Sequence, residues 1–170
     1  LLFEGYWGEA GKVAPSWLNE GLAMLEEEDS STAPERSSWY QAMAQAPKGY
    51  FLPMREFLEI RPAEDLDKRK DDVGPWYVQA YSIVHFLYRK HSRLQFKNLC
   101  ARLRDGRELK ETLWTVYRYP TLEKFEKAWR TWAESPEHRK KVERLGSRAS
   151  RPEDPKDGLR SREFAPFKTR

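Results

Sequence analysis

The sequence predicts a mainly α-helical fold, and three observations support this. Apolar residues recur at helical spacing through much of the first 133 residues, whereas the strict alternation typical of strands is weak. Residues that start and stop helices flank these segments. Aromatic residues make up 14% of the chain, more than a wholly disordered chain carries, so we expect a packed core. With 170 residues, the chain is long enough for one domain of this kind.

The start and stop residues place the expected helices. In the first half of the chain, we expect a helix opened by Pro15 that carries Trp17 to Leu25, one capped by Ser37 or Ser38 that ends at Ala46, and a short one from Pro53 to Ile60. Further along, we expect helices from Trp76 to Tyr88, from Ser92 to Leu103 and near 108–118. A last helix, capped by Thr121, carries Leu122 to Trp132. Proline suits the first turn of a helix, and Ser and Thr suit the position before it. Asp105-Gly106 is a stop signal, and the charged segment 61–74, which ends in Gly74-Pro75, is expected to be a loop.

The helix from Trp76 to Tyr88 is the most apolar of the set. Ile83 and Phe86 extend its apolar stripe almost completely around the helix axis, which predicts a helix buried on several sides. We expect His85 to be a hydrogen-bonded core histidine of this helix. His91 and His138 are expected to be surface residues.

The charge distribution divides the chain at residue 133. Residues 134–170 hold 11 basic and 7 acidic residues, which accounts for the whole net charge of +4 and leaves residues 1–133 neutral. A neutral body argues against a nucleic-acid partner. We expect residues 1–133 to be the helical domain and 134–170 to be a charged, proline-containing, disordered tail with at most a short helix near 138–146. No apolar run approaches the ~20 residues that span a bilayer, and Cys100 is expected to be a small buried hydrophobe.

One short motif points to metal chemistry. Segment 15–23 reads Pro-Ser-Trp-Leu-Asn-Glu-Gly-Leu-Ala. On a helix of about 100° per residue, Glu20 borders the apolar arc that contains Trp17 and Met24. A carboxylate at the edge of a buried face needs a partner, and a metal ion is one candidate. The alternative is an ordinary boundary carboxylate of an amphipathic helix. Gly21 would let a second backbone come close to this helix.

This segment resembles the helix that supplies the third zinc ligand in gluzincin metallopeptidases. In that family, a His-Glu-x-x-His helix supplies two ligands, and a Glu in a Trp-Leu-x-Glu-Gly-hydrophobic-Ala context supplies the third. The resemblance implies that Glu20 is a zinc ligand. The chain has three histidines, His85, His91 and His138, and none belongs to a His-Glu-x-x-His motif. Since the second His of that motif precedes the Glu by about as many residues as separate Glu20 from Leu1, we expect the chain to begin just after the motif.

Segment 77–87 carries a second resemblance, to the helix that follows the zinc site in gluzincin aminopeptidases. That helix opens with a Tyr whose hydroxyl stabilises the tetrahedral oxyanion, which implies this catalytic role for Tyr77. The Lys-Gly of the aminopeptidases is replaced here by Gln79-Ala80. Tyr81, one turn further along, is therefore the alternative donor.

Segment 117–129 resembles the last helix of peptidase MA-like bacterial domains, in which this helix is structural. The three segments together extend the resemblance over residues 1–133. The fold that it implies is the multi-helix C-terminal subdomain of a zincin-like fold.

Two functional hypotheses follow from the resemblance. In the first, the intact protein is a zinc metallopeptidase that hydrolyses a peptide or protein substrate with a metal-activated water, and an upstream helix supplies the two His and the general-base Glu. This chain alone is then inactive and does not hold zinc tightly, because catalytic zinc sites use about three protein ligands. In the second, the domain is a non-catalytic helical binding or scaffold module. The compartment stays open, since related domains are often exported or membrane-tethered through other segments.

Overall fold

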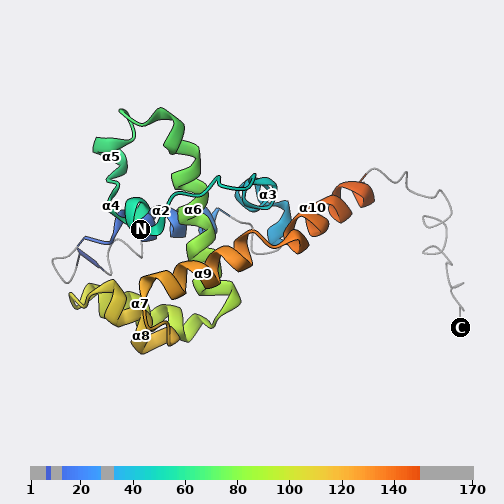
Figure 1. The fold of residues 1–170 in the computed structure, drawn as a ribbon. Coiled ribbons are helices and arrows are strands. Elements are labelled where there is room, and N and C mark those ends of the chain that lie inside the picture. Colours follow the sequence, from blue (N-terminus) through green and yellow to red (C-terminus); the bar gives the residue numbers. More distant parts are fainter. Residues whose placement is uncertain (1–6, 9–12, 28–32, 150–170) are drawn as a thin grey trace, which may run out of the picture.

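Helix α6 (Val73–His85) runs through the middle of the structure, and α2 and α3 pack against it (Figure 1). The structure is a computed structural model, and it describes residues 7–8, 13–27 and 33–149. The other elements are α2 (Ser16–Glu26), η1 (Pro34–Arg36), α3 (Ser38–Gln45), α4 (Met54–Glu59), α5 (Pro62–Asp65), η2 (Lys70–Asp72), η3 (Phe86–Lys90), α7 (Arg93–Arg104), α8 (Leu109–Tyr117), α9 (Leu122–Ala133) and α10 (Pro136–Ala149). These described residues contain no strand, which confirms the mainly α-helical fold class.

Helix α6 is buried around its whole circumference. Nine of its 13 residues are buried, as the apolar residues between Trp76 and Tyr88 predicted. The helix begins at Val73, earlier than expected, so Gly74 and Pro75 lie in its first turn instead of ending a loop. Proline is tolerated there because the first amide groups of a helix have no carbonyl partner within it.

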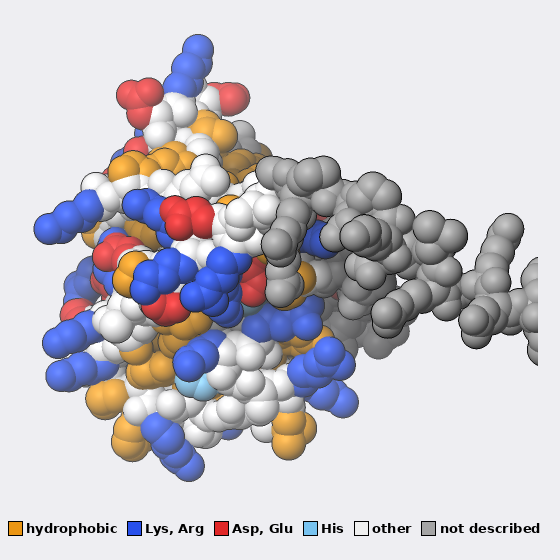
Figure 2. Space-filling view, turned by 90° about the vertical axis from the view of Figure 1, so that its right-hand side faces the viewer, with side chains coloured by type: hydrophobic (Ala, Val, Ile, Leu, Met, Phe, Trp, Pro, Cys, Tyr) orange, Lys and Arg blue, Asp and Glu red, His pale blue; other side chains and the backbone are white. Residues whose placement is uncertain are grey.

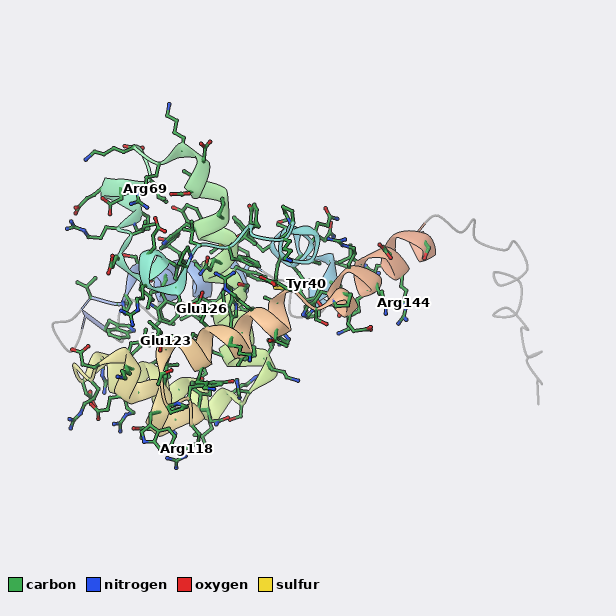
Figure 3. The ribbon with its side chains drawn as sticks, viewed as in Figure 1. Tyr40, Arg69, Arg118, Glu123, Glu126 and Arg144 are labelled. Atoms are coloured by element: carbon green, nitrogen blue, oxygen red, sulfur yellow. The ribbon has the colours of Figure 1, made fainter. Side chains whose placement is uncertain are left out.

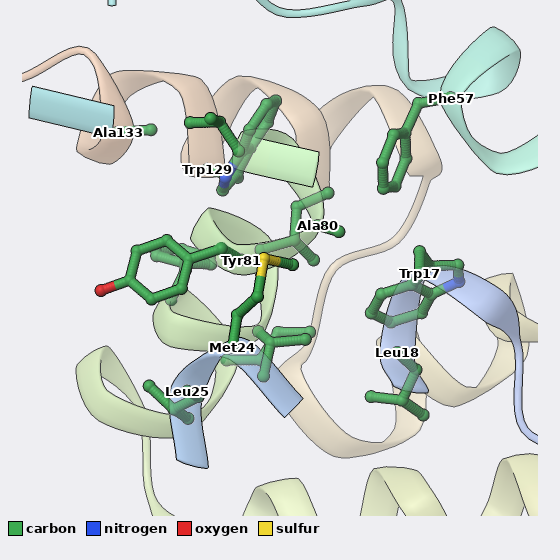
Figure 4. Close-up of a cluster of buried hydrophobic side chains, with 14 of the residues drawn as sticks. Trp17, Leu18, Met24, Leu25, Phe57, Ala80, Tyr81, Trp129 and Ala133 are labelled. Atoms are coloured by element: carbon green, nitrogen blue, oxygen red, sulfur yellow. The ribbon is translucent and has the colours of Figure 1, made fainter. Parts of the chain in front are cut away.

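Helix α2 approaches α6 most closely at Gly21. A Cβ atom at this position would lie 2.5 Å from the carbonyl oxygen of Ala80 and 2.5 Å from a methyl carbon of Val84. Non-bonded heavy atoms pack at about 3.5–4.0 Å, so only glycine fits here. The expectation that Gly21 lets a second backbone come close is therefore confirmed. Figure 4 shows the buried side chains of α2 near Ala80, namely Trp17, Leu18, Met24 and Leu25.

Hydrogen bonds satisfy the polar side chains that α6 carries into the core. The amide of Gln79 exchanges two bonds with the backbone of Leu52: its Oε1 accepts from the N–H at 2.9 Å, and its Nε2 donates to the carbonyl at 3.2 Å. The hydroxyl of Ser82 accepts a bond from the indole N–H of Trp129 at 3.1 Å. Because an unpaired buried polar group costs about 1–3 kcal/mol, these bonds fix a loop and α9 to α6.

Helix α9 also holds the loop before α4. Arg130 donates to the carbonyl of Leu52 at 2.7 Å and pairs with Glu126 at 2.9 Å. Glu126, labelled in Figure 3, accepts a bond from the backbone N–H of Met54 at 3.2 Å. Met54 is the first residue of α4, and Pro53 before it offers no side-chain cap. A carboxylate from another helix therefore satisfies one free amide at this helix start.

The helix-boundary predictions are confirmed at several positions. Ser37, Ser92 and Thr121 each cap a helix by accepting a bond from a backbone amide of its first turn. Gly106, with φ +82°, follows α7 where the stop was expected. Arg118, labelled in Figure 3, ends α8 in the left-handed conformation, with φ 65°.

Two segments contain more helix than the sequence predicted. The expected loop 61–74 holds α5 and η2, so its prediction as a loop is wrong over those residues. Beyond residue 133, α10 covers residues 136–149 and packs against α3 and η1, whereas at most a short helix near 138–146 was expected. Both segments are rich in charged residues and poor in apolar ones, so hydrophobic periodicity gives little signal there.

Some expectations fall on residues outside the described ranges. They concern the chain start at 1–6 and the tail from 150 to 170. Among the residues that are described, none of the helices has both the length and the apolar character needed to cross a bilayer.

We predict that Gly21→Ala lowers the free energy of unfolding by about 3 kcal/mol, because the added methyl group must push α2 away from α6. Urea titration followed by circular dichroism measures the change. The matched control is Gly146→Ala in α10, where a Cβ meets nothing within 4 Å. That variant should gain about 0.5–1 kcal/mol from helix propensity. Equal effects at the two positions would contradict the close contact.

Candidate functional site

Glu20 opens into a surface pocket of about 380 Å³ beside the N-terminal half of α2. The carboxylate is half-buried. Its polar neighbours in the pocket lining are Ser16 and Asn19 from the same helix, and the opposite lining includes Pro62 and Ala63 from α5. The rest of the lining is mainly apolar. Glu20 is therefore the anionic group of an otherwise largely apolar recess that solvent can enter.

Tyr77 lies in the first half of α6, near enough to Glu20 for the carboxylate to disfavour the charged phenolate form of the tyrosine. Burial raises the pKa of the Tyr77 phenol, and the negative charge of Glu20 raises it further. Tyr77 is half-buried and lies outside the lining of the Glu20 pocket. Because the pKa is raised, the hydroxyl stays protonated at neutral pH and can donate a hydrogen bond.

Tyr81, the alternative donor, has a different environment. Its side chain is fully buried, and its hydroxyl lies 3.1 Å from Nδ1 of His85. A phenol in the core cannot reach a substrate at the surface. Of the two tyrosines that the sequence singled out, only Tyr77 has part of its surface exposed.

The described residues do not contain a complete metal site. No group of three or more His, Cys, Asp or Glu side chains comes together within them. Glu20 alone does not fit zinc, which takes about three protein ligands even in catalytic sites. The three histidines do not line the Glu20 pocket. A zinc ion at Glu20 would need ligands from residues outside this described set.

A buried histidine cluster lies apart from the Glu20 pocket. The surface position expected for His138 is wrong, because its side chain is only 7% exposed. Its Nε2 lies 2.8 Å from the carbonyl oxygen of Trp132, so this nitrogen carries the hydrogen and donates. Its Nδ1 therefore accepts a bond from the hydroxyl of Tyr40 at 2.6 Å. Tyr40, on α3 beside α10 in Figure 3, thus ties these two helices together.

His85 belongs to the same cluster and is held neutral. Burial lowers its pKa to about 3, and the positive charges of Arg89 and Lys141, with that of His138 when it is protonated, act in the same direction. Its ring packs against Tyr40 and Trp132. The prediction that His85 is a hydrogen-bonded core histidine is confirmed. His91, expected at the surface, is half-buried.

Two other titratable groups are unsuited to nucleophilic catalysis. Burial raises the pKa of the Cys100 thiol to about 12, which keeps it protonated at neutral pH. Burial also raises the pKa of Tyr117, whose hydroxyl donates to the carbonyl of Leu87 at 3.2 Å. Cys100 is thus the small buried hydrophobe that the sequence predicted.

Of the residues that line the Glu20 pocket, the sequence prediction singled out only Glu20. Ser16 and Asn19 could have been found, because residues three and four apart share one face of a helix. Ser16 stands four residues before Glu20 and three before Asn19. The α5 wall could not, since the segment that forms it was expected to be a loop. Its proline and alanine carry no functional signal of their own.

Comparison with known proteins gives no relative. No protein-family model, curated protein or solved structure matches this chain.

We predict that the protein loses stability between pH 7 and pH 5, chiefly through His85. Its pKa is lower in the folded than in the unfolded protein, so the unfolded state binds more protons in this range. The stabilising contribution is present above the unfolded pKa of about 6.5 and falls as the pH drops below it. The loss from His85 should reach about 2 kcal/mol at pH 5.

Urea unfolding at pH 7 and pH 5, on the parent and on His85→Phe, measures this loss. The variant should show a smaller difference between the two pH values. His91→Phe, at a half-buried histidine whose pKa burial also lowers, serves as the control and should change the difference less. A His85→Phe protein with the same pH dependence as the parent would show that His85 is not the sensitive group.

Proposed function

We propose that this chain forms part of the active site of a gluzincin-type zinc metallopeptidase, with Glu20 as the third zinc ligand and Tyr77 as the oxyanion donor. The observation that carries the proposal is the contact between Gly21 of α2 and Ala80 of α6, because Glu20 adjoins Gly21 and Tyr77 lies one turn before Ala80. Glu20 and Tyr77 come from separate helices, and the close contact between α2 and α6 holds the helices together beside a pocket. The proposal also rests on the Trp-Leu-Asn-Glu-Gly-Leu-Ala motif that surrounds Glu20.

Glu20 meets the requirements for a carboxylate ligand. It lies on α2 at the border of the buried face, and its half-buried side chain lines a pocket that is open to solvent. An upstream His-Glu-x-x-His helix would supply the remaining ligands and the general base. Zinc in such a site polarises the substrate carbonyl and activates a water molecule. Without that helix, we expect this chain to be inactive and to bind zinc weakly.

Tyr77 meets the requirements for a hydrogen-bond donor to an oxyanion. Its phenol is protonated near neutral pH, because a tyrosine ordinarily has a pKa of about 10 and burial raises the pKa of Tyr77 further. The rigid, buried α6 fixes its backbone. A donor that is fixed in advance stabilises the developing negative charge without reorganising, which is the basis of oxyanion-hole catalysis. The substrate would be a peptide or protein.

The second candidate function is a non-catalytic helical binding or scaffold module. It requires no metal ligand beyond the described residues, in which no His, Cys, Asp and Glu side chains form a group of three. The two candidates differ in one property, since only the enzyme requires a His-Glu-x-x-His sequence close upstream of Leu1 in the gene. Sequencing that region gives the first discrimination.

We predict that Glu20→Gln removes zinc and peptidase activity from the full-length product of the gene. The amide has the same size as the carboxylate but no negative charge, so it is a poor zinc ligand. Zinc content by atomic absorption and cleavage of a fluorogenic peptide library measure the two effects. Glu26→Gln is the matched control, because Glu26 is an exposed carboxylate on the same helix. It should leave both properties unchanged.

We predict that Tyr77→Phe lowers kcat by about 10²–10³ and leaves the zinc content intact, because one oxyanion donor is lost. Tyr88→Phe, at another half-buried tyrosine, is the control and should retain full activity.

A Glu20→Gln protein that keeps its zinc and its activity would refute the enzymatic proposal. A gene product with no zinc and no His-Glu-x-x-His motif would favour the binding module.

A further inference from the structure

A second pocket, of about 530 Å³, lies near the C-terminal end of α6, between η3, α9 and α10. It shares no lining residue with the Glu20 pocket. Its volume falls in the usual range of small-ligand sites, about 300–1,000 Å³. The proposed peptidase function does not use this pocket.

Aromatic rings form much of the pocket wall. Phe86 and Trp132 pack with their ring centroids 5.3 Å apart, and Phe86 also contacts His91 at 5.0 Å. Tyr119 and His138 extend the wall through ring contacts with His91 and Trp132. Because each ring packs against another, the wall is preorganised. Phe86 is only 3% exposed and supports the wall from behind, whereas Trp132 and Tyr119 are half-buried and present the accessible ring surface. Such surfaces favour a planar apolar group.

The charges on the lining add to a single positive charge at neutral pH. Lys90 and Lys141 are the cations, and Glu137 is the anion. Glu137 is already paired with Lys140, outside the lining, at 2.8 Å. Lys141 lies 3.5 Å from Glu35 but keeps about half of its side chain exposed, at 51%. Lys90 is exposed at the end of η3.

The positive potential reaches the histidines around the pocket. Burial is the main cause of the lowered pKa of His91, and the charge of Lys90 lowers it further. Lys141 likewise lowers the pKa of His138, whose largest shift comes from burial. Both imidazole rings are therefore neutral at pH 7, so they line the pocket as uncharged aromatic groups and do not add to its positive charge. Figure 2 shows Lys and Arg side chains spread over the face seen from the right-hand side of Figure 1, with a histidine among them.

We propose that this pocket binds a small aromatic carboxylate, with the ring against Trp132 and Tyr119 and the carboxylate toward Lys90 and Lys141. The aromatic side chains of the lining suit an aromatic ring, and the single net positive charge of the lining suits one carboxylate. A carboxylate beside an aromatic ring occurs both in free aromatic acids and at the end of a peptide whose last residue is Phe. The shared chemistry defines the site, and the size of the preferred probe distinguishes the two sources.

The test is a titration of the ¹⁵N-labelled chain with N-acetyl-L-phenylalanine, followed by NMR. We expect shifts at the Trp132 indole N–H and at the backbone amides of Lys90 and His91. N-acetyl-L-phenylalanine amide lacks the charge and N-acetylglycine lacks the ring, so both should bind at least about fivefold more weakly, the effect of one partly exposed ion pair or one ring contact. Tighter binding of N-acetyl-Ala-Ala-Phe would assign a peptide C-terminus, and equal binding would assign a small acid.

Charge variants separate this site from non-specific binding. Lys90→Gln should weaken binding about three- to fivefold, and Lys90→Gln combined with Lys141→Gln should weaken it about tenfold. Lys127→Gln is the matched control, because Lys127 is an exposed lysine of α9 outside the lining. No shift at Trp132 would overturn the proposal. Equal binding of the amide, or full binding by the double variant, would also overturn it.

Discussion

The close approach of α2 to α6 at Gly21 and Ala80 is the constraint on which the rest of the structure depends. A backbone carbonyl occupies the space that any larger residue at position 21 would need. The same contact positions the two residues of the proposed site, because Glu20 is the neighbour of Gly21 and Tyr77 lies one turn before Ala80 on α6. Core packing and the candidate site therefore share one contact. A substitution that separates the helices would also disturb the relation between the carboxylate and the phenol.

Polar groups inside this core specify how the other helices meet α6. Gln79 bonds to the backbone of a loop much as a neighbouring strand would, and Ser82 receives the indole of Trp129 from α9. At the other end of α6, His85 and His138 belong to a buried cluster that joins α3 and α10. Such groups are costly to bury unpaired, so each bond favours one arrangement of helices over others. The π-helical η3 follows α6 directly and carries Lys90 into the second pocket.

Local signals in the sequence predicted most of the fold. Capping residues such as Ser92 and Thr121 act within one helical turn, so they can be recognised without knowledge of the rest of the chain. The failures involve distant partners. His138 is buried where it forms a hydrogen bond with Tyr40, which lies 98 residues away in the sequence. No local sequence pattern predicts a contact over that separation. For the same reason Glu20 and Gly21 could be singled out from their motif, whereas the α5 wall of the Glu20 pocket could not.

The central claim is that Glu20 is a zinc ligand next to Tyr77. Crystals of the full-length gene product grown with zinc, measured on both sides of the zinc absorption edge, test it most directly. We expect an anomalous peak about 2.0–2.2 Å from a carboxylate oxygen of Glu20, with two histidine nitrogens completing the protein ligands. The Tyr77 hydroxyl should face the open side of the metal. A peak elsewhere, or no peak near Glu20, would contradict the account and leave Glu20 as a boundary carboxylate of an amphipathic helix.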